Sequence, residues 1–250
     1  MRFRSVVVLT TSAIVLVAIH PARAAEIKVM CPPPMRSLMA ELAPRFAQAS
    51  GHTVTLIAAP SKDIVARLAG GEATDVALLT AEASDGLITS GTLARRIDIV
   101  RSLIGVAVRA GAPKPDVGSA DAFRRTLLAA QSFARNEGAD SGAYMKGLIE
   151  RLGIADAMAP RTKLVTSGYV AALVARGEVA LGAQQVSELM SVPGVDVTPL
   201  GPDIQHVIVF SAAIAPHPAA PTAVDALVAY LTSPAAAPVI SAKGLEPAAP

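Results

Sequence analysis

The chain has few aromatic residues and almost no cysteine. Its 250 residues include no tryptophan, 3% are aromatic, and Cys31 is the only cysteine. A single cysteine excludes an intramolecular disulfide, so stability must come from the apolar core. We predict that Cys31 is a small buried residue rather than a nucleophile. Because 52% of the residues are hydrophobic, we expect a core built from Ala, Val, Leu and Ile.

Residues that carry enzymatic chemistry are also sparse. Beyond the N-terminal segment the histidines are His52, His206 and His217, and none has a spacing typical of a zinc site. The sequence contains neither a Gly-x-Ser-x-Gly elbow nor a phosphate-binding loop. No basic patch or aromatic platform is present to hold nucleic acid. We therefore predict no metal, no cofactor, no nucleic-acid partner and no catalytic residue, and we expect that the protein is not an enzyme.

The first 24 residues have the pattern of a signal peptide. Arg2 and Arg4 precede an apolar run over Val6–Ile19, and Ala22-Arg23-Ala24 fits the rule for cleavage. A single membrane anchor is the alternative, but this run is shorter than the roughly 20 residues that a span needs. Removing the leader changes the formal net charge from +2 to about −1. We predict a cleaved peptide over 1–24 and a periplasmic protein.

Strand and helix patterns alternate along the rest of the chain. Ser and Gly residues mark where most helices start and stop, and this alternation predicts an α/β architecture with parallel sheets. The predicted strands are 26–30, 53–58, 75–79, 103–109, 132–136, 180–184 and 207–215. The predicted helices are 36–49, 62–69, 81–90, 120–130, 142–152, 169–176, 186–190, 221–231 and 234–242.

Two segments are too long for ordinary connections and predict crossings between lobes. They cover 98–109, followed by a stretch rich in Pro and Gly, and 195–215, which Pro199 and Pro202 interrupt. The division that follows is lobe one over 26–104 plus 208–250 and lobe two over 105–207. In such folds ligands bind in the crevice at the carboxyl ends of the strands.

The turn from Val29 to Met35 is the strongest local pointer to this crevice. It reads V-M-C-P-P-P-M and joins an apolar strand to a helix. The apolar residues of this helix are predicted to fall on one face; they are Met35, Leu38, Met39, Leu42 and Phe46. The N-terminus of a helix is a common anion site, because its first N–H groups have no partner. Pro32, Pro33 and Pro34 have no N–H to donate, so the turn predicts a cleft but limits which ligand can occupy it.

Several segments resemble the periplasmic molybdate-type solute-binding proteins of ABC importers. The resemblance is carried by 26–51, by A-R-L-A-G-G-E-A-T-D-V-A-L-L over 66–79, by D-S-G-A-Y-M-K-G-L-I-E-R-L-G over 140–153, and by 231–247. It implies a divergent member with an α/β, two-lobed type 2 periplasmic-binding fold that has two hinge crossovers. It also implies closure of the lobes around a small anionic solute, delivery to a membrane ABC permease, and a monomer.

The resemblance implies five ligand positions, and two of them differ chemically from the family pattern. The first falls on Pro34 in place of a serine. The second, third and fourth fall on Ser61, Ser141 and Ser167, and the fifth falls on Gln185 in place of a tyrosine. As an alternative, the three serines are plain helix N-caps without a ligand.

These differences favour a ligand other than molybdate. A dehydrated oxyanion needs several neutral donors, and Pro34 supplies neither a hydroxyl nor an N–H. Gln185 offers a carbonyl acceptor beside its donor. Arg36, in the first helical turn, is suited to pair with a carboxylate or phosphate, or it is simply a solvated charge. The predicted ligand residues are Arg36, Ser61, Ser141, Ser167 and Gln185.

Two functions follow. The first is a periplasmic receptor that captures a molybdate-like oxyanion or a small organic acid for import. The alternative is a secreted enzyme on the same fold that acts on a small carboxylic acid.

Overall fold

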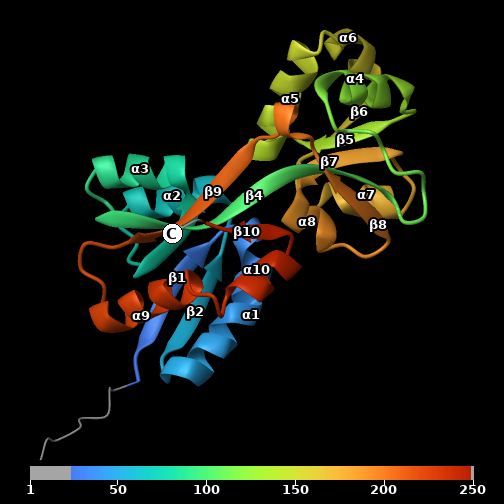
Figure 1. Ribbon diagram of the computed structural model, residues 1–250. Helices are drawn as coiled ribbons and strands as arrows, with labels where there is room; N and C mark the ends of the chain where they lie inside the picture. The colour runs from blue at the N-terminus through green and yellow to red at the C-terminus, as the bar shows by residue number, and fades with distance from the viewer. Residues whose placement is uncertain (1–23, 249–250) are drawn as a thin grey trace, which may run out of the picture.

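Two α/β lobes are joined by the long strands β4 and β9 (Figure 1). The structure is a computed structural model that describes residues 24–248. The predicted signal peptide therefore lies, but for its last residue, outside the described residues. Between residues 24 and 248, no helix combines the length and the apolar character needed to cross a membrane.

The first lobe takes its elements from both ends of the chain, and the second lobe takes them from the middle. The first lobe contains β1 (Glu26–Cys31), α1 (Pro33–Ser50), β2 (Thr53–Ala58), α2 (Ser61–Ala69), β3 (Val76–Thr80), α3 (Ala81–Thr89), α9 (Pro221–Leu231), α10 (Ala237–Ala242) and β10 (Leu245–Pro247). The second contains α4 (Ala120–Ala129), β5 (Phe133–Asn136), α5 (Asp140–Arg151), α6 (Ala155–Met158), η1 (Ala159–Arg161), β6 (Thr162–Val165), α7 (Val170–Ala175), β7 (Leu181–Gln185), α8 (Val186–Met190) and β8 (Val195–Pro199). The connecting elements are β4 (Arg95–Arg109), η2 (Pro202–Ile204) and β9 (Val207–Ile214).

The sheet is mixed, which corrects the prediction of parallel sheets. Its strand order is β2-β1-β3-β9-β4-β7-β5-β6, and β8 and β10 also pair with β4. β1 is parallel to β2 and β3, and β5 is parallel to β6 and β7. In contrast, β9 is antiparallel to β3 and β4, and β4 is antiparallel to β7. The strand–helix alternation predicted the parallel units correctly. It did not indicate that β4 and β9, which connect the lobes, run antiparallel to their neighbours.

The two crossovers lie side by side, and the side chain of Gln205 forms hydrogen bonds between them. β4 pairs with β9 as far as Leu103 and with β7 from Ile104 onward. Gln205 lies between η2 and β9. Its Oε1 accepts from the Ile104 N–H at 2.8 Å, and its Nε2 donates to the carbonyls of Ile104 and Leu200, both at 3.1 Å. This change of partners supports the proposed lobe boundaries, 26–104 plus 208–250 and 105–207.

Each part of the sheet is covered by helices on both faces. In the first lobe, α1, α9 and α10 pack on one face around Phe46 and Phe210, and α2 and α3 pack on the other. In the second lobe, the larger core cluster gathers around Phe123 and Phe133. The predicted apolar face of the first helix is confirmed, since all of its members are buried; they are Met35, Leu38, Met39, Leu42 and Phe46.

Three elements have the predicted bounds, whereas several short elements were not predicted. α8, α9 and β2 have the predicted bounds. The helix α6 and the strands β6, β8 and β10, each three to five residues long, were not predicted. So few residues do not establish a period that distinguishes a strand from a loop.

Candidate functional site

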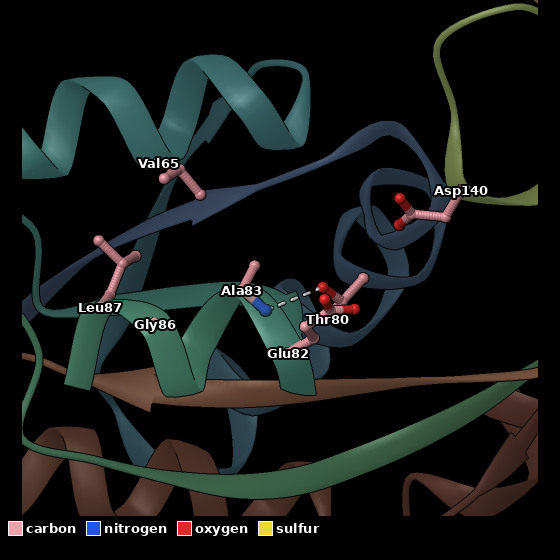
Figure 2. A pocket seen from close by; sticks show the side chains of 7 residues that line it. All are labelled: Val65, Thr80, Glu82, Ala83, Gly86, Leu87 and Asp140. Atoms are coloured by element: carbon pink, nitrogen blue, oxygen red, sulfur yellow. Dashed lines mark hydrogen bonds between the residues drawn. The ribbon is translucent and has the colours of Figure 1, made fainter. Parts of the chain in front are cut away.

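A polar opening lies between the two lobes. A cavity of about 470 Å³ is lined by Thr80 and Glu82 from the first lobe, by Asp140 and Tyr144 from the second, and by His206 at the crossover. An adjoining cavity shares Thr80, Glu82 and Asp140. In Figure 2 the Asp140 carboxyl points across this opening toward Thr80 and Glu82. The volume suits a small organic molecule.

On the side of the first lobe, the N-terminus of α3 forms the wall. Thr80 caps this helix, since its Oγ1 accepts from the Ala83 N–H at 3.3 Å (Figure 2). Glu82 lies in the first turn, where a negative charge interacts favourably with the helix dipole. The wall therefore brings a carboxylate to the opening.

The N-terminus of α1 offers no free main-chain donor. Pro33 and Pro34 are its first two residues and lack an N–H. The next two N–H groups, at Met35 and Arg36, both donate to the Pro32 carbonyl, at 3.0 and 3.2 Å. An anion at this helix end could be met only by the Arg36 side chain, which is exposed.

Cys31 ends β1 directly before this turn and is fully buried. Burial raises the pKa of its thiol to about 11, against the opposing charge of Arg36. Since the thiolate is the reactive form, Cys31 is protonated at neutral pH and acts as a small core residue, as predicted.

Asp140 is the first residue of α5 and carries the carboxyl group nearest the centre of the cleft. Partial desolvation by the cleft walls raises its pKa, and the negative charge of Glu82 adds to this effect, while His206 opposes it. His206 is stacked on the Tyr144 ring with the centroids 4.7 Å apart. Tyr144 in turn donates its hydroxyl to the Ile204 carbonyl at 2.8 Å. The Tyr144 ring therefore both lines the cavity and supports His206.

A group of buried polar side chains lies beside Asp140, at the carboxyl ends of β5 and β7. We call Asn136, Ser141, Gln185 and Glu188 the polar cluster; each is at most 8% exposed. Within residues 24–248, none of the atoms Asn136 Oδ1, Ser141 Oγ, Gln185 Oε1 and Glu188 Oε2 has a hydrogen-bond partner. β5 and β7 are adjacent parallel strands, so their carboxyl ends meet at one edge. Buried polar atoms without partners are costly, and their concentration here favours a ligand site.

Close backbone packing brings α5 to this edge. A Cβ atom on Gly142 would lie 2.1 Å from the Asn136 carbonyl oxygen, so only glycine lets the helix begin directly against the end of β5. The tight turn places Asp140 and Ser141 next to the polar cluster.

Within the polar cluster, Glu188 has a carboxyl group with a strongly raised pKa. Burial raises its pKa to about 7; the charge of Asp140 adds to the increase, and the side chain of Gln184 and the N–H of Gln185 lower it as donors. The Gln184 amide is oriented by the Val170 N–H, which donates to its Oε1 at 2.9 Å. Glu188 is consequently half protonated near neutral pH.

The predicted ligand residues lie at the strand ends but in two separate groups. Ser141 and Gln185 meet in the polar cluster. Arg36 and Ser61 lie on the first lobe, after the paired strands β1 and β2. Ser167 is exposed in the loop after β6, and the helix it was expected to open begins only at Val170, whose N–H is already taken by Gln184. The ligand role of all five remains a prediction.

The alternative that the three serines are plain N-caps is wrong. The residues at the N-caps of α2, α5 and α7 are Pro60, Ala139 and Tyr169, and none of these helices has a side-chain cap. For Ser141 this leaves a buried hydroxyl without a partner in the described chain.

Sequence reasoning missed the acidic residues of the cleft. Asp140 was considered only as part of a loop, and Glu82, Glu188 and His206 were not assigned to the site. A weak signal existed for Glu188, which stands as a single acid in the short apolar helix V-S-E-L-M after a buried strand. Nothing in the sequence shows that this acid points inward. Within residues 24–248, no group of three or more metal-ligating side chains is present.

Comparisons with known proteins agree with this architecture. Residues 27–246 match the model of a family described as bacterial extracellular solute-binding protein. An aconitate isomerase from Pseudomonas sp. is 40% identical over 216 residues, which cover 83% of this chain and 82% of that protein.

Solved structures show the same fold at low identity. The substrate-binding domain of a putative molybdenum ABC transporter from Clostridium difficile has a TM-score of 0.75 at 13% identity, covering 90% of this chain and 100% of that one. The Azotobacter vinelandii periplasmic molybdate-binding protein has a TM-score of 0.69 at 18% identity, covering 90% and 99%. The two-lobed periplasmic-binding fold implied by the sequence is thereby confirmed.

One sequence-based expectation is overturned. The scarcity of catalytic motifs led to the prediction that the protein is not an enzyme, but the relative from Pseudomonas is named for a catalytic activity. A carboxyl group that is placed to transfer a proton has no sequence signature, so an absence of motifs does not exclude catalysis.

Proposed function

The chain belongs to the bacterial extracellular solute-binding proteins, and we propose that it is a secreted isomerase that moves a proton within a small unsaturated tricarboxylic acid such as aconitate. The observation that carries the proposal is Asp140, a carboxyl group with a raised pKa that faces the cavity between the lobes. The relative at 40% identity supports the choice of substrate.

The reaction needs no cofactor, because one proton changes place. In the proposed step the Asp140 carboxylate accepts a proton from the CH₂ carbon of aconitate. The electron pair of the broken C–H bond is delocalised over the three-carbon unit and its carboxylates. Return of the proton from Asp140 to the other end of that unit shifts the double bond and completes the isomerisation. A raised pKa suits this role, because a general base works best when its pKa approaches the working pH.

The rest of the cleft would hold the carboxylates of the substrate. Arg36 can pair with a planar carboxylate through two N–H groups. Ser141, at the N-terminus of α5, adds a hydroxyl and the positive end of the helix dipole. The lack of donors at α1 disfavours a tetrahedral oxyanion that must be surrounded by N–H groups.

A periplasmic receptor is the second candidate function, favoured by the family match over residues 27–246. In that case the protein would capture an anionic solute and deliver it as a monomer to a membrane ABC permease, without chemical change. The same cleft would serve both functions, so turnover is what separates them.

The proposed function is tested by following trans-aconitate in D₂O by NMR with the purified protein. We expect conversion to the cis isomer, and deuterium enters the product to the extent that the proton held by Asp140 exchanges with solvent before it returns to carbon. Ser141→Ala should weaken apparent affinity about tenfold to a hundredfold, since a hydrogen bond to a charged group is lost. Ser241→Ala, an exposed serine of α10, serves as the matched control. Tight binding without conversion would favour the receptor.

Arg36→Ala should remove most of the stabilisation that the substrate gives. A ligand that binds only the folded state raises the melting temperature, and Arg36 would supply a positive charge to pair with a carboxylate of the substrate. Because Arg36 is exposed, we expect the melting temperature of the free protein to stay nearly unchanged. Thermal-shift measurements with trans-aconitate check this, and an unaltered ligand shift would exclude Arg36 from the site.

A further inference from the structure

The negative charges of the cleft pose a problem for an anionic substrate. Glu82 and Asp140 face the opening. Glu188 is buried in the polar cluster with its Oε2 unpartnered among the described residues, and the charge of Asp140 acts on it. A tricarboxylate that enters this region adds further negative charge. Like charges at close range favour the protonated form of one of the carboxyl groups.

Glu188 is the acid best placed to take that proton. Helix α8 packs against β4, β7, β8, α1 and α7. From these elements and from α5, the only charge that acts on Glu188 is that of Asp140, and the groups that favour its ionised form are the neutral donors Gln184 and the Gln185 N–H. Within residues 24–248, no Lys or Arg side chain is among the groups that shift the pKa of Glu188, so no positive charge compensates its carboxylate.

The other two acids are less suited. Glu82 is exposed to solvent at the N-terminus of α3 and is not part of the buried polar cluster. Asp140 has His206 beside it, which opposes the rise of its pKa. Its carboxylate must also be free of a proton in order to accept one from the substrate.

We propose that Glu188 is the proton-holding residue of the cleft and takes up one proton when a polycarboxylate binds next to Asp140. The proposal rests on the site of the proposed function but not on turnover. Glu188 acts through Asp140: by becoming neutral, it allows the substrate and an ionised Asp140 to occupy the cleft together. Glu188 is therefore a positioning residue and not a catalytic one, because its protonation allows Asp140 to remain ionised beside the substrate.

The proposal predicts a specific dependence of binding on pH. Below the pKa of Glu188, which is about 7, the proton is already present and binding takes up little. Above it, the wild-type protein must collect a proton, so affinity falls with rising pH. The variant Glu188→Gln is neutral at every pH and should bind about tenfold more tightly than wild type at pH 8, because only about a tenth of wild-type Glu188 is protonated there.

Isothermal titration of trans-aconitate at pH 8, in buffers of different ionisation enthalpy, measures the proton uptake directly. We expect about one proton per ligand for the wild type and close to none for Glu188→Gln. Glu150→Gln, which removes an exposed acid of α5, should behave as wild type. A merely structural role for Glu188 would change affinity without changing the number of protons.

The outcomes separate this proposal from the proposed function. Binding without proton uptake, or uptake that persists in Glu188→Gln, overturns the role of Glu188 and leaves isomerisation open. Binding with uptake but no conversion supports Glu188 and overturns the isomerase. Absence of binding contradicts both.

Discussion

Replacing Asp140 with asparagine is expected to slow the isomerisation of aconitate by about 10²- to 10⁴-fold, the usual contribution of a general base. The amide keeps the size of the side chain but cannot accept the proton from carbon. Asp140 is exposed to the cleft, so the fold should not depend on its charge. Steady-state kinetics should show the loss in kcat, with KM changed far less.

Asp121→Asn is the matched control for this measurement. Asp121 is also exposed and lies in the first turn of a helix, α4, away from the cleft. Both variants lose one negative charge at a helix N-terminus. A difference between their kcat values therefore reflects the position of Asp140 in the cleft and not the loss of charge alone. A kcat for Asp140→Asn within threefold of wild type would assign the proton transfer to another group.

Replacing Glu188 with glutamine is expected to remove a large pH dependence of stability. The pKa of this carboxyl is raised from 4.5 to about 7 by burial, so the folded state binds its proton more tightly than the unfolded state. The free energy of unfolding of wild type should therefore fall as pH rises from about 4.5, until it levels off above 7. Between pH 5 and pH 8 the loss amounts to about 2–3 kcal/mol.

The difference in free energy of unfolding between Glu188→Gln and wild type should therefore shift by this amount, in favour of the variant, from pH 5 to pH 8. For a chain of this size the shift corresponds to roughly 5–10 °C in melting temperature. Thermal unfolding of both proteins at pH 5 and pH 8 measures this effect. The informative quantity is how the difference in melting temperature between variant and wild type changes with pH. Glu178→Gln is a suitable control, because the pKa of exposed Glu178 is lowered by Arg176 and Lys163. A difference between Glu188→Gln and wild type that is the same at pH 5 and pH 8 would show that Glu188 titrates normally.

The Pro-rich turn illustrates how far local chemistry can be inferred from a sequence. Proline has no N–H, so the weakness of α1 as an anion site could be predicted from Pro33 and Pro34 alone. The structure adds that the N–H groups of Met35 and Arg36 donate to the Pro32 carbonyl. That contact depends on the path of the turn, which three prolines in a row do not specify by themselves.

The long strands illustrate the opposite case. The length of the segment 98–109 predicted a crossing between lobes, but the pairing of β4 with β7, β8, β9 and β10 joins segments that lie far apart in the sequence, as in the pairs Ile104–Gln185 and Arg95–Ile214. Such pairing is decided by how both lobes pack, and a local pattern carries no information about it.

By itself, the sequence determined the alternating α/β architecture, the apolar face of α1 and the poor anion site at the prolines, because periodicity and proline chemistry act over a few neighbouring residues. Only the tertiary structure decided that Asp140 and Glu188 belong to one site. They are 48 positions apart and come together because β5 and β7 are adjacent parallel strands. Their pKa values depend on burial and on each other, and both are properties of the folded chain.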